Sequence, residues 1–102
     1  MENAIDRYRR AVQQSPQNNL AQFSLGKALF EAGDWAAAKE PLQFALDSKP
    51  DWMVAAILIG KCESALGRRD EARAAFQKAL QLAIDQRHDG PQAEIEELLA
   101  NL

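Results

Sequence analysis

The sequence predicts an all-α fold, an α-solenoid built from about six helices that pair as antiparallel hairpins. Three observations predict it. Apolar and small residues recur at three- and four-residue spacing along the whole chain, which is the period of a helix face. No segment alternates strictly between apolar and polar residues, so no strands are expected. The chain also repeats itself at an interval of 34 residues.

The repeat is visible when the chain is aligned with itself after a shift of 34 residues. Small residues then coincide with small residues, large apolar residues with large ones, and glycine with glycine. Because the spacing within each matching set is helical, the sets mark one packed face in each of three successive units. The coinciding residues are Ala4, Ala38 and Ala72; Tyr8, Leu42 and Phe76; Ala11, Ala45 and Ala79; Val12, Leu46 and Leu80; Pro16 and Pro50; Leu25-Gly26-Lys27 and Ile59-Gly60-Lys61; and Gly33 and Gly67.

Residues that end or begin helices divide the chain into its expected helices. Pro16 and Pro50 end the helices before them, because proline disfavours helix at the preceding residue. Gly33 and Gly67 supply the positive φ at which a helix ends and the chain turns. Asp34 is placed to cap the helix that follows. We expect helices at about 2–14, 18–32, 35–48, 52–66, 69–85 and 91–101.

Three positions refine this prediction: two prolines, and one isoleucine that stands where the repeat has proline. Pro41 lies in mid-helix, where it removes one hydrogen bond and should kink the third helix. Ile84 replaces the terminal proline of the pattern, so the fifth helix should run longer. Pro91 suits the start of the last helix, which is expected to cap the array with a polar outer face. Its inward apolar face would consist of Ile95, Leu98, Leu99 and Leu102.

Composition restricts the classes of function. A chain of 102 residues, 47% apolar and 26% charged, is expected to form one domain without long disorder. The net charge of −3 and the acids beside each pair of arginines argue against nucleic-acid binding. A lone cysteine excludes an internal disulfide. The longest apolar run is too short to cross a bilayer, and no signal peptide is recognisable, so we expect a cytoplasmic protein with no membrane contact.

With these motifs in place, the sequence resembles the tetratricopeptide repeat family. Leu25-Gly26 matches the family's Leu-Gly step, and Ala38 and Leu42 match its pattern of alanine followed by a large residue. The resemblance implies a single domain over 1–102, with a half repeat at 2–18, full repeats at 19–52 and 53–86, and a capping helix at 91–102. It also implies a right-handed superhelix that binds another protein or peptide and is not an enzyme.

Candidates for chemistry are few. The single histidine, His88, lies in a predicted loop. Cys62 is one turn from Leu58 and Leu66 and is expected to be a small buried residue. No nucleophile–base pair, metal-ligand cluster or phosphate-binding glycine loop can be assembled from the sequence. We therefore expect no catalytic residues, no metal and no cofactor.

The remaining candidate is a groove. The resemblance implies that the first helices of successive hairpins line a concave surface, which would bind a partner's peptide or helix. Burial in the core is the alternative for the aromatic and aliphatic residues, and ordinary solubility is the alternative role of the two lysines. The partner-binding residues expected on this surface are Leu20, Phe23, Lys27, Phe30, Val54, Ile57, Lys61 and Ser64.

Some assignments stay open at the level of sequence. A carboxylate clamp for chaperone tails is largely absent, so that ligand is not predicted. Trp35 is expected to be structural, whereas Trp52 fits either packing against the next hairpin or exposure at the groove edge. The first predicted helix lacks its usual partner helix. The alternative function is therefore self-assembly, as a homodimer or larger homo-oligomer.

Overall fold

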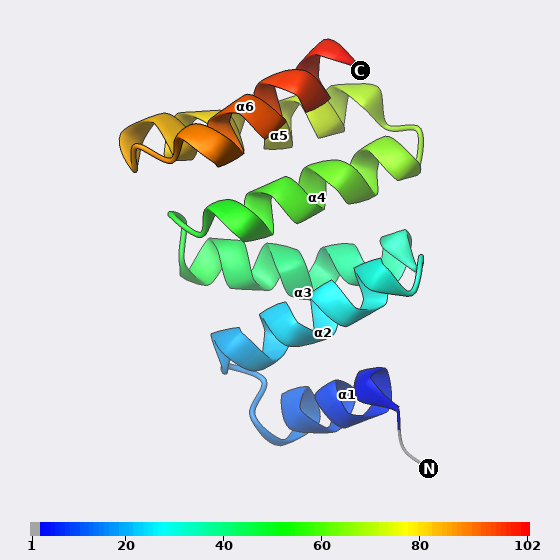
Figure 1. The fold of residues 1–102 in the computed structure, drawn as a ribbon. Helices are drawn as coiled ribbons and strands as arrows, with labels where there is room; N and C mark the ends of the chain where they lie inside the picture. Colours follow the sequence, from blue (N-terminus) through cyan, green and yellow to red (C-terminus); the bar gives the residue numbers. More distant parts are fainter. Residues whose placement is uncertain (1–2) are drawn as a thin grey trace.

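The computed structural model describes residues 3–102, and within that range it contains six α-helices and no strand. Short turns of three or four residues join the helices, which is why consecutive helices fold back on one another (Figure 1). The helices are α1 (Ala4–Gln14), α2 (Asn19–Glu31), α3 (Trp35–Ser48), α4 (Met53–Ala65), α5 (Arg69–Asp85) and α6 (Asp89–Ala100).

The predicted boundaries are confirmed to within two residues wherever the structure describes them. Residue 2, which the sequence placed in the first helix, lies outside the described residues. The last helix begins at Asp89 rather than Pro91, because proline is also tolerated within the first turn, where backbone N–H groups have no partner inside the helix. The expected lengthening of α5 is confirmed, since it is the longest helix at 17 residues.

Side-chain caps begin the first three helices. The side chains of Asn3, Asn18 and Asp34 each accept a hydrogen bond from the backbone N–H three residues later, at 2.8, 3.1 and 3.3 Å. Each cap satisfies one of the N–H groups that a helix start leaves unpaired. The predicted cap at Asp34 is therefore present. Pro41 lies buried inside α3, which continues through it as one helix.

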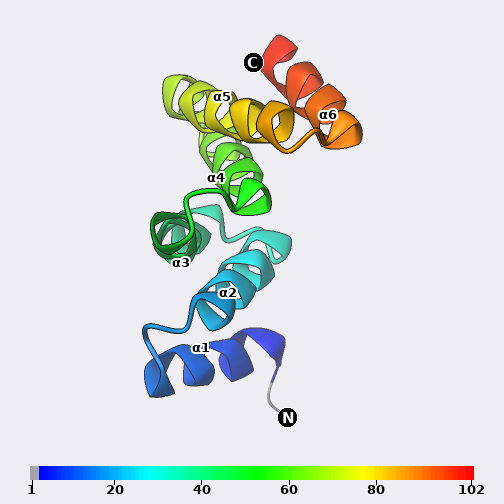
Figure 2. The same cartoon turned by 90° about the vertical axis from the view of Figure 1, so that its left-hand side faces the viewer.

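The helices stack into an elongated body of about 41 × 27 × 20 Å. Figure 2 shows α3 and α5 on one side of α4, and α2 and α6 on the other. Each helix packs most closely against its neighbours in the chain, and α2 also contacts α4. The expected helical-repeat solenoid is thus the observed architecture, with α4 at its centre.

Two glycines allow the paired helices to approach closely. A Cβ atom added to Gly26 would lie 2.6 Å from Cγ of Leu42, and one added to Gly60 would lie 2.4 Å from the ring of Phe76. A Cβ at either position would force the neighbouring side chain to shift. The glycine of each Leu-Gly or Ile-Gly step is therefore a packing requirement, set by the large residue 16 positions later in the paired helix.

Three helix ends share one backbone geometry. After α2, α4 and α5, a residue with positive φ turns the chain: Gly33 at 81°, Gly67 at 77° and Arg87 at 58°. In each case its N–H donates to the carbonyl three residues back, and the next N–H donates to the carbonyl five residues before it. This is a Schellman ending, which glycine favours because it has no Cβ. The sequence predicted the two glycines but not Arg87.

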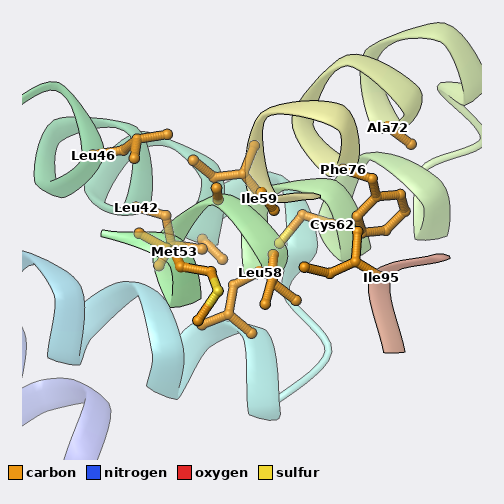
Figure 3. Close-up of a cluster of buried hydrophobic side chains, with 14 of the residues drawn as sticks. Leu42, Leu46, Met53, Leu58, Ile59, Cys62, Ala72, Phe76 and Ile95 are labelled. Atoms are coloured by element: carbon orange, nitrogen blue, oxygen red, sulfur yellow. The ribbon is translucent and has the colours of Figure 1, made fainter. Parts of the chain in front are cut away.

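The core runs continuously through the stack (Figure 3). Its largest fully buried side chains are Leu42, Cys62, Phe76 and Ile95, from four successive helices. Cys62 is buried, as predicted, and Ile95 anchors α6 against the rest. Trp35, in contrast, was expected to be structural but is 38% exposed, because the first position of α3 lies at the edge of its hairpin.

Candidate protein-binding surface

The predicted groove residues of α2 occupy an exposed edge of the stack. Leu20 is 66% exposed, which is the highest value among the large apolar side chains of residues 3–102. Phe23 and Phe30 are partly buried and pack against the core. Their position fits burial in the core and leaves part of each ring accessible, so both interpretations of these residues stay open. The side chain of Lys27 is 57% exposed.

Trp52 completes this edge. Its ring stacks on that of Phe23, with centroids 4.4 Å apart and planes inclined by 21°. The ammonium group of Lys49 lies 5.8 Å from the centre of the Trp52 ring. Trp52 therefore packs between hairpins while remaining partly exposed, and both roles that its sequence position allowed are realised. The stacked pair links the start of α2 to the residue before α4.

A hollow of about 310 Å³ lies between α1 and α2. Leu20, Phe23 and Lys27, which the sequence placed on the groove, line it together with Tyr8, which the sequence assigned to a packed face and, in the self-assembly alternative, to the unpartnered first helix. Among residues 3–102, α1 packs mainly against α2, and α3 and α4 contact α2 without lining this hollow. Its complete lining consists of Ala4, Tyr8, Leu20, Phe23, Ser24, Lys27, Ala28 and Glu31.

The predicted groove residues of α4 do not form one surface. Val54 is 44% exposed, but Ile57 is only 7% exposed and belongs to the core. Ile57 therefore offers little surface to a partner in this structure, since α4 packs against α2, α3 and α5. Ser64 is exposed at the far end of α4, where it lines a separate hollow of about 170 Å³ with Asn101 and Leu102.

The two equivalent lysines already have carboxylate neighbours. Lys27 lies 3.8 Å from Glu31 on its own helix, where both side chains are well exposed. Lys61 lies 3.2 Å from Glu94, which belongs to α6. A carboxylate of a partner would have to compete with these acids, each held by a surface ion pair worth about 0–1 kcal/mol.

Two larger hollows, of about 540 and 570 Å³, lie on the other side of the stack, over α4 and between α3 and α5. Both are lined by Gln43, Asp47, Ile59 and Glu63. The buried carboxylate of Glu63 forms an ion pair with Nζ of Lys39 at 2.8 Å.

The structure gives Cys62 no reactive character. Burial, with the nearby Glu63 carboxylate, raises the pKa of its thiol to about 11, against a smaller opposing effect of Lys39. A thiol with such a pKa is almost entirely protonated at neutral pH and is a poor nucleophile. Among residues 3–102, no three His, Cys, Asp or Glu side chains are grouped to hold a metal ion. No helix in that range is long and apolar enough to cross a membrane.

Comparisons with known proteins agree with the repeat pattern. A family model of the tetratricopeptide type, described as "Anaphase-promoting complex, cyclosome, subunit 3", matches residues 1–79. A TPR repeat-containing protein of Pseudomonas aeruginosa is 33% identical over 92 residues, which cover 90% of this chain and 86% of that protein.

Solved structures share the whole fold. The solution structure of a Bordetella parapertussis protein is 30% identical, covers 99% of this chain and 88% of its own, and superposes with a TM-score of 0.85. The first TPR domain of Spaghetti (RPAP3), solved with the HSP90 peptide SRMEEVD, superposes with a TM-score of 0.75. It is 21% identical and covers 94% of this chain and 77% of its own.

Proposed function

Because the chain belongs to the tetratricopeptide repeat family, we propose that it is a non-catalytic protein-interaction module. Its partner would dock a peptide or helix on the edge formed by α2 and the start of α4, which we call the α2–α4 edge. The residues assigned to this edge are Leu20, Phe23, Lys27, Trp52 and Val54. A peptide bound to a related fold, in the Spaghetti domain, supports the general mode of action.

The observation that carries the proposal is the exposure of apolar side chains at this edge. Leu20 and Val54, at equivalent positions one repeat apart, are 66% and 44% exposed. Between them in sequence lie Phe23 and Trp52, whose stacked rings form a rigid and partly exposed platform. Burial of apolar surface supplies about 25 cal/mol per Å², so a partner that covers these side chains gains affinity there. Rigid aromatic groups are also frequent anchors of interfaces.

Lysines at the edge favour an acidic group on the partner. Lys27 is well exposed, and its distance of 3.8 Å from Glu31 makes a weak ion pair that a partner's carboxylate could replace. Lys61 is less available, because its side chain is 33% exposed and Glu94 lies 3.2 Å away. Charges at the rim of an interface speed association more than they deepen affinity. The main electrostatic contribution is therefore assigned to Lys27.

Partner capture with matched variants tests this proposal. The combined substitution of Leu20→Glu and Val54→Glu should abolish capture of specific partners from a lysate of the source cells. Ile84→Glu should leave capture unchanged, since Ile84 is also exposed, at 47%, but lies on α5. Circular dichroism should give all variants the parent's helix content. Equal capture by the double variant and the parent would overturn the assignment of the edge.

A partner obtained in this way allows a kinetic test of the lysine. Lys27→Glu should slow association several-fold at low salt and leave the dissociation rate nearly unchanged. Surface plasmon resonance at two salt concentrations separates these rates. A change in the dissociation rate alone would place Lys27 within the buried part of the interface rather than at its rim.

A further inference from the structure

We infer that the two larger hollows between α3 and α5, which together we call the α3–α5 channel, form a second docking surface for a basic segment of another protein. Two acidic side chains of α3, Glu40 and Asp47, would bind its bases. The channel is separate from the α2–α4 edge, because α3 and α5 lie on one side of α4 and α2 lies on the other (Figure 2). The inference therefore goes beyond the proposed function and does not depend on it.

The channel is long enough for a short peptide. Its two parts, of about 540 and 570 Å³, share Ile59 and Glu63 of α4 and Gln43 and Asp47 of α3, so they are neighbouring parts of one depression. The lining residues of α3 run from Ala36 to Asp47, which is about 16 Å at the helical rise of 1.5 Å per residue. About five residues of an extended segment, at roughly 3.3 Å each, span this length.

Apolar side chains line much of the first part, the hollow of about 540 Å³. They include buried Ile59, half-buried Phe44 and the exposed Ala36. Long basic side chains lay their methylene stems along such surfaces and keep the charged end in water. An arginine or lysine side chain therefore matches the channel in its apolar part as well as in its charge.

The charges of the first part do not balance. Its lining contains one basic side chain, Lys39, which is already paired with the buried carboxylate of Glu63 at 2.8 Å. The other two acids, Glu40 and Asp47, are exposed and form no ion pair with a basic side chain of residues 3–102. Asp47 accepts a hydrogen bond from the neutral amide of Gln43 at 2.8 Å. An incoming base can therefore approach two carboxylates without displacing an internal cation.

The spacing of these acids indicates the spacing of the partner's bases. Glu40 and Asp47 are seven positions apart on α3, so they lie on one face of the helix and about 10 Å from each other along it. Two residues three positions apart in an extended segment are separated by about the same distance. The segment that fits best therefore carries two bases with two residues between them.

The second part, of about 570 Å³, adds no preference of its own. Its α5 side contributes one acid and one base, Glu71 and Lys78, together with the small side chains of Ala74 and Ala75. The charges of Glu71 and Lys78 cancel in the net charge of the lining. The excess of negative charge, and with it the recognition of the bases, is assigned to α3.

Other occupants fit the channel less well. Nucleic acid would bring phosphates against the excess of carboxylates. A metal ion needs several ligands at one point, and no three His, Cys, Asp or Glu side chains of residues 3–102 are grouped for one. A second copy of the chain would have to present one of its two arginine pairs, and acids stand beside both: Asp6 at the first pair, and Asp70 and Glu71 at the second. A segment of another protein can carry bases without these acids.

Panning of displayed random heptapeptides on the full chain tests the inference. The parent should enrich peptides with two basic residues. The double variant Glu40→Gln with Asp47→Asn, which keeps the side-chain shapes and removes both charges, should not enrich them. The matched control Glu96→Gln with Glu97→Gln removes two exposed charges of α6 and should enrich the same peptides as the parent. This control separates recognition by the channel from general attraction to an acidic protein.

A synthetic peptide of the most enriched sequence then locates the site. Titration into the isotope-labelled full chain should shift the amide resonances of Gln43 and Ile59 and leave that of Leu20 in place. Loss of the Glu40 and Asp47 charges should weaken its binding by about tenfold or more. Spermidine, which has aliphatic amines but no peptide groups, should displace it only at much higher concentration. Sedimentation of the protein alone should give a constant monomer mass.

Each opposite result would overturn the inference: no enrichment of basic peptides, equal enrichment by the Glu40→Gln, Asp47→Asn variant, or resonance shifts confined to Leu20 and the α2–α4 edge. Displacement by spermidine at the concentration of the peptide would assign the channel to a small polyamine. A protein mass that doubles with concentration and returns to the monomer in the double variant would assign it to a second copy. Partner capture by the Leu20→Glu, Val54→Glu variant is measured separately, so the inference and the proposed function fail independently.

Discussion

Helices α2 and α4 are equivalent segments one repeat apart, yet they differ greatly in burial. Both have 13 residues and share a Gly-Lys step, but α4 buries nine residues and α2 only three. Helix α4 packs against α2, α3 and α5, whereas the hollow leaves one flank of α2 open. The comparison teaches that burial in this chain is set by a helix's place in the stack as well as by its own motif.

The largest effect on the free energy of unfolding should come from truncating Phe76, and truncation of its more exposed equivalent Tyr8 gives the comparison. Phe76→Ala should lower the free energy of unfolding by about 3–5 kcal/mol, because the ring is 1% exposed and its loss leaves a cavity. Tyr8→Ala should lower it by only about 1–2 kcal/mol, since the ring is only partly buried. Urea unfolding followed by circular dichroism measures both.

The difference between the two variants is the informative quantity. If Tyr8→Ala proves as costly as Phe76→Ala, the α1 end is as tightly packed as the centre, and the hollow is not an open site. Phe76→Leu, which keeps most of the apolar volume, provides the control and should cost less than Phe76→Ala.

A smaller effect should come from filling the two glycine contacts. Gly60→Ala should destabilise by about 1–3 kcal/mol, because the added Cβ would lie 2.4 Å from a fully buried ring. Gly26→Ala should cost less, since Leu42 has side-chain rotations with which to yield and the helix gains up to about 1 kcal/mol from alanine. Thermal and urea unfolding of both variants checks the order.

Rescue separates overpacking from other causes. The combination of Gly60→Ala with Phe76→Leu should be more stable than the sum of the two single changes, because the smaller side chain makes room for the methyl group. Strict additivity would show that the glycine is needed for another reason.

The sequence predicted the fold well because the repeat presents each packing rule more than once. Gly26 and Gly60, each followed 16 residues later by a large apolar residue, marked the helix contacts before any coordinates were considered. The surface was predicted less well. Ile57 was assigned to the groove by the family resemblance, but it is 7% exposed in the central helix of the stack, whereas Phe23 is partly buried beside Trp52. The repeat predicts which residues are equivalent, whereas the exposure of each residue depends on which helices pack against it.

Long-range pairs were the second source of error. The contact between Lys61 and Glu94 joins α4 to α6 across 33 residues, and the pair of Lys39 with Glu63 joins α3 to α4. Neither has a local spacing that a sequence can reveal. The Phe23–Trp52 stack is of the same kind, since it depends on how one hairpin sits on the next.

The smallest expected effect concerns the third Schellman ending. Gly33 and Gly67 adopt positive φ freely, but Arg87 does so at φ 58° with a Cβ present. A left-handed residue other than glycine costs about 1–2 kcal/mol, part of which is offset because glycine is more flexible in the unfolded chain. Arg87→Gly should therefore stabilise the protein by about 0.5–1 kcal/mol, which urea unfolding at fixed salt can resolve. Arg87→Ala removes the same side chain but keeps the strained Cβ, so it should bring no gain. A gain of equal size in both variants would trace the effect to the lost guanidinium charge and leave the backbone geometry without a measurable cost.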